Sequence, residues 1–437
     1  MLDLLIKNAD ILTMDGACPV VIGGAVGIKD GKIEFVSAAV PENAEDARRV
    51  IDAKGNIVMP GLVNTHAHAA MCVMRGYADD YRLNEWLFEK IFPVEARLTR
   101  EAVLAGVRLG VAEMLASGTT SFSDMYSNES AAASIIEEAG IRANLSNGVI
   151  ALSDGFDFES DRAAKELREL IRSWHGAANG RILADASIHA EYTSPPWVWE
   201  KEHEIAAQYG LVTHIHLAET EHEVNECKAR HGGLSPVEMF NKYGIFDTPV
   251  SAAHCVCLSE NDMRILAQKQ VSAAHCPLSN LKLASGIANV RRLIELGVNV
   301  SLGTDGCASN NTHDLFEEIK LATLLAKGTS LDPTAVPAYQ VLKMATLNGA
   351  KAQGRSNVGQ LAAGFDADLI MLDVHSPHMQ PVYSPAATAA YAANGGDVCL
   401  TMVQGKVLYE NGEWKTIDIE KAIADVNRIA VPIVLKN

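Results

Sequence analysis

The first 57 residues alternate short apolar runs with turn residues. Runs that suit β-strands cover 4–14, 25–38 and 48–59, and the second and third contain the pairs Asp30-Gly31 and Gly55-Asn56. Strand-like runs joined by such pairs are typical of β-hairpins. The pattern therefore predicts a small β unit at the start of the chain.

The pattern changes over residues 58–358, where apolar runs alternate with stretches of helical periodicity, such as 100–117 and 130–141. Alternating strands and helices predict a parallel sheet with helical crossovers, and there are enough units here to close a barrel. The strand-like runs of the second half of this region are 181–190, 211–219, 249–256, 270–276 and 299–305.

Strand character returns after residue 358, at 365–375 and 398–414, before a helical segment that begins at Ile419. We expect both ends of the chain to form one β-subdomain. The predicted fold class is α/β, a distorted (β/α)8 TIM barrel over 58–358 with a small β-sandwich subdomain built from 1–57 and 359–437.

Composition narrows the class of protein. Of the 437 residues 48% are hydrophobic and 21% charged, as in ordinary globular proteins, and no apolar run is long enough to span a bilayer. The start of the chain lacks the apolar segment of a secretory signal, which indicates a cytoplasmic protein. A net charge of -17 without a compact Lys/Arg cluster argues against a nucleic-acid partner. Eight scattered cysteines without a CxxC spacing indicate reduced thiols.

His66 and His68 end an apolar run two positions apart. Side chains at i and i+2 of a strand lie on one face, so both imidazoles can reach one ion. Such a pair alone does not distinguish a metal site from two hydrogen-bonded histidines. The sequence adds polar residues at the ends of other strand-like runs, where barrel active sites are built: His216 with Glu219, His254 and Asp305. Three histidines and an aspartate would bind a divalent ion and leave room for water.

Two further histidines compete for these roles. His214 shares a strand face with His216, but His216 lies nearer the strand end and has the His-x-x-Glu spacing to Glu219, so we favour His216 as the ligand. His214 is then an interior histidine. His275 also ends a strand-like run and could line the pocket, although we expect a structural role for it.

Motifs along nearly the whole chain resemble the amidohydrolase superfamily, in the cytosine deaminase and chlorohydrolase branch that includes the methylthioadenosine/S-adenosylhomocysteine deaminases. They are DGKI, PGLVNTHAH, LNEWLFEKIFPVEARLT, HLAETEHE, AAHC, LGTDG with ASNN, and GQLAAGFDADLIMLD.

The resemblance implies one divalent metal ion, usually zinc and in some relatives iron, because no strand-end lysine suggests the bridging residue of binuclear relatives. Its implied ligands are His66, His68, His216 and Asp305, with Glu219 and His254 catalytic together with Asp305. The ion would lower the pKa of a water molecule, Asp305 and His254 would orient that water, and Glu219 would carry a proton to the ring nitrogen of the substrate.

The resemblance also implies a substrate of the adenosine type and a homo-oligomeric enzyme. The positions that match substrate contacts are Trp86, Glu95 and His189, and a glutamate at position 95 suits ribose hydroxyls. Asn147 stands where relatives that use S-adenosylhomocysteine can have an arginine, and Arg162 could supply another cation. We therefore expect 5′-methylthioadenosine or plain adenosine to be preferred to the homocysteine adduct.

Two alternative functions are compatible with the same predicted site residues. The leaving group could belong to another amino-heterocycle, of the guanine, pterin or s-triazine type, and Glu219 speaks against hydrolases that work without a proton-carrying carboxylate. The chain could also be a catalytically idle metal-binding protein, since a fold does not fix a function. The completeness of the predicted site argues against idleness.

Overall fold

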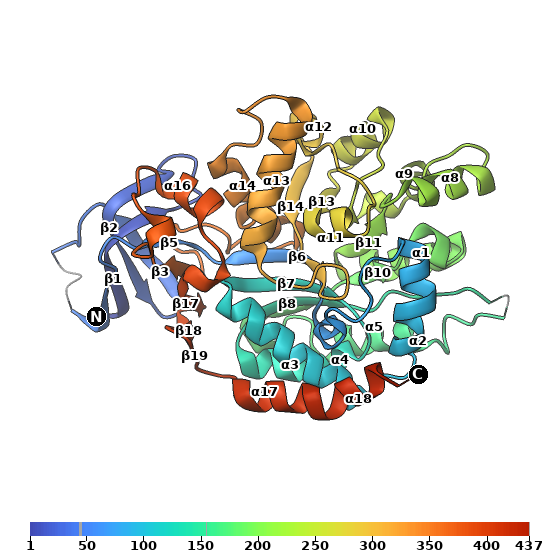
Figure 1. Cartoon of the computed structure of the whole chain (residues 1–437), viewed down its shortest axis with the longest axis horizontal. Helices are drawn as coiled ribbons and strands as arrows, with labels where there is room; N and C mark the ends of the chain where they lie inside the picture. Colours follow the sequence, from blue (N-terminus) through green and yellow to red (C-terminus); the bar gives the residue numbers. More distant parts are fainter. Residues whose placement is uncertain (43–45, 154, 437) are drawn as a thin grey trace.

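Strands from both ends of the chain form one sheet in the computed structural model, which describes residues 1–42, 46–153 and 155–436. The sheet has nine strands in the order β19-β18-β17-β16-β5-β1-β2-β3, with β4 paired to β1, and it lies at one end of the molecule (Figure 1). Its strands are β1 (Leu2–Leu12), β2 (Val20–Lys29), β3 (Lys32–Ser37), β4 (Ala47–Asp52), β5 (Ile57–Pro60), β16 (Leu369–Leu372), β17 (Val398–Val403), β18 (Lys406–Glu410) and β19 (Glu413–Trp414).

The turn between β2 and β3 lies at the predicted pair. Asp30 and Gly31 have φ of 50° and 77°, and a two-residue hairpin turn of this hand requires positive φ at both central positions. The turn sets β2 and β3 antiparallel, with Lys29 opposite Lys32.

The middle of the chain forms two five-stranded parallel sheets, in the orders β15-β6-β7-β8-β9 and β10-β11-β12-β13-β14. Nearly all residues of these strands are buried, because helices cover the sheets. They are β6 (Leu62–His68), β7 (Thr119–Met125), β8 (Arg142–Ser146), β9 (Ile182–Ala184), β10 (Ala186–Ile188), β11 (Thr213–Leu217), β12 (Val250–His254), β13 (Ser272–His275), β14 (Asn299–Leu302) and β15 (Asp305–Gly306).

The expected closed barrel is found only in part. The predicted strand 181–190 is interrupted at Asp185, so that β9 pairs with β8 and β10 pairs with β11. Within the described residues no backbone ladder joins β14 to β6, and side chains bridge them instead: Thr65 Oγ1 donates to Leu302 O at 2.8 Å, and Asn64 Oδ1 accepts from Thr304 N at 3.0 Å.

Helices lie against the outer faces of these strands, and α17 and α18 of the chain end run along α3 (Figure 1). The longer helices are α3 (Arg100–Ala116), α4 (Glu129–Ala139), α5 (Arg162–Ser173), α7 (Pro196–Tyr209), α8 (Glu221–Arg230), α10 (Glu260–Gln268) and α13 (Leu315–Ser330). The shorter ones are α1 (Leu83–Glu85), α2 (Phe92–Glu95), α6 (Ala177–Gly180), α9 (Pro236–Lys242), α11 (Pro277–Lys282), α12 (Val290–Glu295), α14 (Ala338–Met344), α15 (Leu347–Ala352), α16 (Pro385–Ala387), α17 (Ile419–Asp425) and α18 (Val431–Val434). None of the helices in the described ranges is long and apolar enough to cross a bilayer.

Arg142 links the parallel strands to the nine-stranded sheet. It lies on β8, is 2% exposed, and donates to Asp368 Oδ2 at 2.6 Å and to Asp366 Oδ2 at 2.7 Å. Both carboxylates belong to the loop that leads into β16. A buried guanidinium that is paired twice fixes how the two sheets are oriented at this contact.

Replacing Arg142 by alanine leaves the buried Asp368 carboxylate without its cation, whereas Asp366 keeps its ion pair with Lys32 at 2.9 Å. We expect Arg142→Ala to lower the free energy of unfolding by about 3–5 kcal/mol. Urea unfolding followed by circular dichroism measures the change. Arg264→Ala is the control, because the Arg264–Glu260 pair is about half exposed and we expect a loss below about 1 kcal/mol. Equal losses in the two variants contradict the assigned role of Arg142.

Candidate functional site

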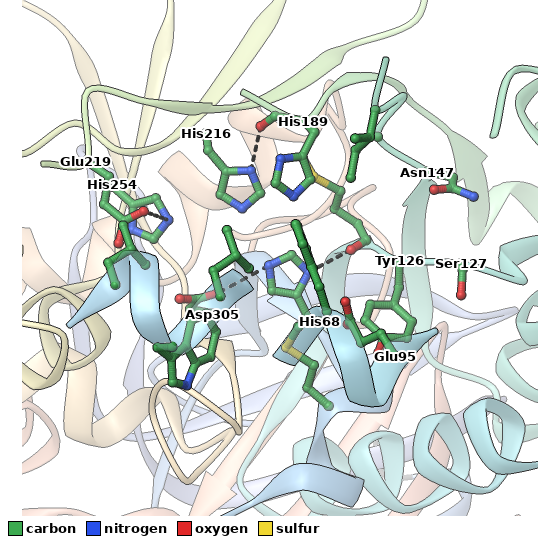
Figure 2. Close-up of a pocket in the computed structure, with 18 of the residues that line it drawn as sticks. His68, Glu95, Tyr126, Ser127, Asn147, His189, His216, Glu219, His254 and Asp305 are labelled. Atoms are coloured by element: carbon green, nitrogen blue, oxygen red, sulfur yellow. Dashed lines mark hydrogen bonds and ion pairs between the residues drawn. The ribbon is translucent and has the colours of Figure 1, made fainter. Parts of the chain in front are cut away.

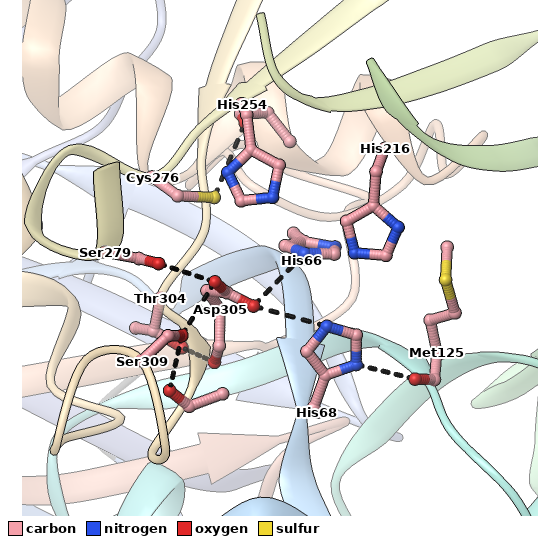
Figure 3. Close-up of polar contacts among 12 residues, drawn as sticks. His66, His68, Met125, His216, His254, Cys276, Ser279, Thr304, Asp305 and Ser309 are labelled. Carbon is pink, nitrogen blue, oxygen red and sulfur yellow. Dashed lines mark hydrogen bonds and ion pairs between the residues drawn. The ribbon is translucent and has the colours of Figure 1, made fainter. Parts of the chain in front are cut away.

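Five polar side chains gather at the carboxyl ends of the parallel strands. His66 and His68 come from β6, His216 from β11, His254 from the last position of β12, and Asp305 from the first position of β15. Figure 3 shows the four imidazoles arranged around the Asp305 carboxylate. We refer to these five residues as the ligand cluster.

The ligand cluster is compact enough for one ion. Asp305 Oδ1 lies 3.4 Å from His66 Nε2 and 3.2 Å from His68 Nε2. The ligand atoms of His66, His68 and His216 lie within 4.8 Å of one another, and the same holds for His66, His254 and Asp305. Three imidazoles and a carboxylate are a donor set that suits zinc or another divalent transition metal.

Backbone carbonyls orient two of the imidazoles. His68 Nδ1 donates to Met125 O at 2.6 Å, and His216 Nδ1 donates to His189 O at 2.6 Å. A carbonyl only accepts, so Nδ1 carries the hydrogen and the lone pair is on Nε2 in the neutral ring. This tautomer presents Nε2 to the centre of the cluster, as metal-binding histidines require.

His66 supports the metal interpretation most directly. Its ring is fully buried, and Nε2 has no hydrogen-bond partner in the described part of the chain. On the other side of the ring, Nδ1 lies 2.9 Å from His214 Nε2. A buried ring nitrogen without a partner is costly, and an ion in the cluster would satisfy it. His214 thus lies behind His66, although its own Nδ1 has no partner among the described residues.

Hydroxyl groups hold the Asp305 carboxylate. Its Oδ2 accepts from Ser279 Oγ at 2.6 Å and from Ser309 Oγ at 2.7 Å, which leaves Oδ1 for His66 and His68. Burial alone would raise the pKa of Asp305, but the neighbouring His66 and His68 imidazoles lower that pKa well below its ordinary value. The residue is therefore an anion at the centre of the cluster.

Glu219 lies beside the ligand cluster. It is 7% exposed, its Oε2 is 3.8 Å from His254 Nε2, and its Oε1 accepts from Ser285 Oγ at 3.1 Å. Burial raises the pKa of Glu219 above its ordinary value, although His254 lowers it. His254 is held in turn by Asn280, whose Oδ1 lies 2.9 Å from Nδ1. A carboxyl with a raised pKa can carry a proton near neutral pH.

A pocket of about 300 Å³ opens onto the ligand cluster. Figure 2 shows Glu219 and His254 on one side of it and Asn147 and Ser127 on the other. Every residue that the sequence predicts to contact substrate lines this same pocket: Trp86, Glu95, Asn147, Arg162 and His189.

Three of these residues combine a place in the pocket lining with a polar group of note. Trp86 Nε1 and His189 Nδ1 are buried and have no partner in the described ranges. The His189 ring lies 4.8 Å from that of His216, centroid to centroid. Glu95 faces Tyr126 (Figure 2), and burial raises the pKa of the Glu95 carboxyl. A bound molecule would therefore contact the rings of Trp86 and His189 and the carboxyl of Glu95, all of which line the pocket.

Asn147 and Arg162 lie at the far wall, and both are already bound to protein. Asn147 Nδ2 donates to Glu166 Oε2 at 2.6 Å, and Arg162 Nη2 donates to Asn128 Oδ1 at 2.7 Å. The guanidinium of Arg162 is exposed at the rim. The wall thus contains a carboxylate as well as a cation.

The sequence interpretation missed several contributors. Tyr126 and Tyr192 line the pocket, and Ser279 and Ser309 bind Asp305. Their position after strand ends is the signal that could have found them, because such loops build the site. His275 is buried at the end of β13 and is not among the pocket residues, which agrees with a structural role.

A second cluster of potential metal ligands lies outside the pocket lining. Glu191, Cys227 and His231 approach within 4.8 Å of one another. Glu191 already accepts from Arg230 and from His231 Nε2, the latter at 2.8 Å. The guanidinium neutralises the carboxylate, so we interpret this group as an ion-pair network that ties α8 to its neighbours.

Comparisons with known proteins agree with the geometry. The model of the amidohydrolase family matches residues 57–408. A 5'-deoxyadenosine deaminase of Methanosarcina mazei is 47% identical, covering 100% of this chain and 99% of that protein. A 5-methylthioadenosine/S-adenosylhomocysteine deaminase of Moorella thermoacetica is 46% identical over 97% of this chain and 98% of its own length.

A solved structure shares the fold. An adenosine deaminase from Xanthomonas campestris with bound zinc superposes with a TM-score of 0.93, at 32% identity, covering 99% of this chain and 98% of that one. The match of the family model over most of the chain, the identity to full-length relatives and the strand-end cluster lead to one conclusion. The chain belongs to the amidohydrolase family.

Proposed function

We propose that this protein is a metal-dependent hydrolytic deaminase of adenosine-type nucleosides, which releases ammonia and the inosine analogue. The observation that carries the proposal is the buried Glu219 carboxylate beside the ligand cluster, in one pocket. Metal hydrolysis needs only the cluster, whereas deamination also needs a group that delivers a proton to the ring.

The ligand cluster fits one divalent ion, and we propose zinc first and ferrous iron second. His66, His68, His216 and Asp305 would hold it. The unpartnered Nε2 of His66 and the carbonyl-bound Nδ1 atoms of His68 and His216 support this set. When bound, the ion would act as a Lewis acid and would lower the pKa of a water molecule towards about 7.

The chain's own groups would move the protons. Asp305, held by two serine hydroxyls, accepts a proton from the attacking water, and His254 orients that water. Glu219 donates a proton to the ring nitrogen next to the attacked carbon, which makes that carbon more electrophilic. The C–O bond forms, and the amino group takes up the proton held by Asp305 as the C–N bond breaks, so that it leaves as ammonia. Glu219 regains a proton from the new hydroxyl group, which becomes the carbonyl oxygen of the product.

The remaining pocket residues would bind the nucleoside. With its amino group at the ligand cluster, the sugar extends towards Glu95, whose carboxyl can accept hydrogen bonds from ribose hydroxyls. Trp86 and His189 would contact the base through their rings, which line the pocket. The 5′ end then points to the wall that contains Asn147 and Arg162.

This wall supports a preference for neutral 5′ substituents. Glu166 already engages the Asn147 amide, and Arg162 is bound to Asn128. A substrate carboxylate placed here would lie near the Glu166 carboxylate, which binds Asn147, and Arg162 already donates to Asn128. Unpaired charge is costly to bury, so adenosine, 5′-deoxyadenosine and 5′-methylthioadenosine suit the wall better than S-adenosylhomocysteine.

A substrate panel tests the proposal. We expect kcat/KM for the three neutral adenosines to exceed that for S-adenosylhomocysteine by at least about tenfold, or about 1.4 kcal/mol, measured as ammonia release. 5′-Butylthioadenosine is the control, because its tail is long but uncharged and separates the effect of size from that of charge. Guanine, cytosine and melamine represent the alternative substrates. Ammonia release from one of these and from no adenosine contradicts the proposal.

Our proposal also covers the closure of the barrel, the β-subdomain and the oligomeric state. We propose that the two parallel sheets together form one distorted barrel. We propose further that the nine-stranded sheet corresponds to the β-sandwich subdomain of 1–57 and 359–437, and that the enzyme is a homo-oligomer. Light scattering combined with size-exclusion chromatography measures the last of these.

A further inference from the structure

The start of α8 differs from that of its neighbours. The described α-helices α9 and α10 each begin with a capping box, in which the third helical side chain accepts from the N–H of the capping residue. Glu238 Oε2 accepts from Ser235 N at 2.8 Å at the start of α9, and Asp262 Oδ2 accepts from Ser259 N at 2.8 Å at the start of α10.

Glu223 occupies the same third position in α8, and Thr220 caps that helix by accepting from Glu223 N at 3.1 Å. The Glu223 carboxylate does not return to Thr220. It reaches further back along the chain, where Oε1 accepts from Ala218 N at 2.9 Å and Oε2 accepts from Glu219 N at 2.7 Å. Glu223 is 7% exposed, so these bonds are shielded from water.

The clamped peptides lie where β11 turns into α8. Ala218 has a φ of 50°, a left-handed conformation that non-glycine residues rarely adopt. Its carbonyl oxygen accepts from Val256 N at 3.2 Å and from Cys257 N at 2.8 Å. The turn is thus held from one side by Glu223 and from the other by the chain after β12.

This turn determines where the Glu219 side chain lies. Glu219 directly follows Ala218, and its carboxylate meets Ser285 at 3.1 Å and His254 at 3.8 Å. If the turn relaxed, the carboxylate would move relative to the ligand cluster. A displacement of about 1 Å at a reacting group can cost about 10²-fold in rate.

We propose that Glu223 is a positioning residue, which clamps the N–H groups of Ala218 and Glu219 and so holds the Glu219 carboxylate at the distance that proton transfer needs. The proposal rests on the role of Glu219 in the proposed function. The clamp itself is a structural statement and can be tested without turnover.

The test compares Glu223→Gln with Glu238→Gln. Glutamine has one acceptor oxygen in place of two, so each variant weakens hydrogen bonds to backbone N–H groups near the start of a helix. Only Glu223→Gln affects the turn that contains Ala218 and Glu219. In Glu223→Gln we expect kcat on the best substrate of the panel to fall about 10–100-fold, with KM within about threefold and the metal content unchanged. In Glu238→Gln we expect kcat within about twofold of the parent.

A double variant that combines Glu223→Gln with Glu219→Gln distinguishes an effect on the position of Glu219 from a general loss of structure. If Glu223 acts through Glu219, Glu223→Gln lowers activity little further in the Glu219→Gln background. An equal additional loss in that background overturns the proposal, as does a loss of kcat in Glu238→Gln that equals the loss in Glu223→Gln.

Amide hydrogen exchange provides a readout that does not need a substrate. In Glu223→Gln we expect the peptide that covers 217–223 to exchange at least about tenfold faster, and in Glu238→Gln the faster exchange to be confined to 234–240. Unchanged exchange over 217–223 overturns the clamp. If the parent deaminates nothing, the proposed function fails, while the exchange result still decides whether the clamp exists.

Discussion

Replacing Glu219 by glutamine is expected to lower kcat for deamination by about 10²–10⁴-fold, while the protein stays folded and keeps its metal. Glutamine has nearly the same shape but cannot carry a proton, and general acid–base groups contribute rate factors of this size. Ammonia release and metal analysis on the purified variant measure both parts of the expectation.

The neighbouring Glu221 provides the matched control. It lies in the same acidic run but is exposed at the first position of α8. We expect Glu221→Gln to keep kcat within about twofold, because exposed carboxylates away from a site contribute little. Full activity in Glu219→Gln, or an equal loss in the two variants, contradicts the proton-carrying role.

Removal of the divalent ion by a chelator is expected to abolish activity, and one equivalent of Zn²⁺ per chain is expected to restore it. Binding to the folded state alone also stabilises the protein, by about 4 kcal/mol at a free ion concentration of 1,000 Kd, so the melting temperature should fall on removal. Metal analysis, activity and thermal unfolding on the same sample test the three statements together.

Two variants separate the ligand cluster from the second group of potential ligands. We expect Asp305→Asn to lose the ion, because it replaces the carboxylate by a neutral amide. Cys227→Ser should still bind one equivalent, because Cys227 belongs to the group with Glu191 and His231. A second ion that is lost in Cys227→Ser, or unchanged activity after chelation, contradicts the assignment.

Local patterns predicted much of the fold. The Asp30-Gly31 turn lies where expected, and the helix predicted over 100–117 is α3, Arg100–Ala116. The break at Asp185 could not be predicted, because the run 181–190 contains no glycine or proline to mark the point where its halves pair with different sheets. The contact of β14 with β6 through Thr65 depends on tertiary packing in the same way.

The sequence also predicted which residues of the candidate site lie together. Strand-end positions brought His66, His68 and Asp305 into one set, and in the structure Asp305 Oδ1 lies 3.4 Å from His66 Nε2 and 3.2 Å from His68 Nε2. Their catalytic and binding roles stay predictions. The contact of Glu223 with two peptide N–H groups left no trace in the sequence, because every residue except proline carries such a donor. The acidic run around it resembles any solvated helix start.

The nine-stranded sheet has a consequence for how the chain is made. β5 ends at Pro60, and its partner β16 begins at Leu369, so most of the protein leaves the ribosome before that pairing can form. Contacts between such distant segments slow folding, and an unpaired strand edge invites association with other chains. The nascent protein therefore carries an open β edge while all the described parallel strands are translated, and β16, which covers that edge, comes after them.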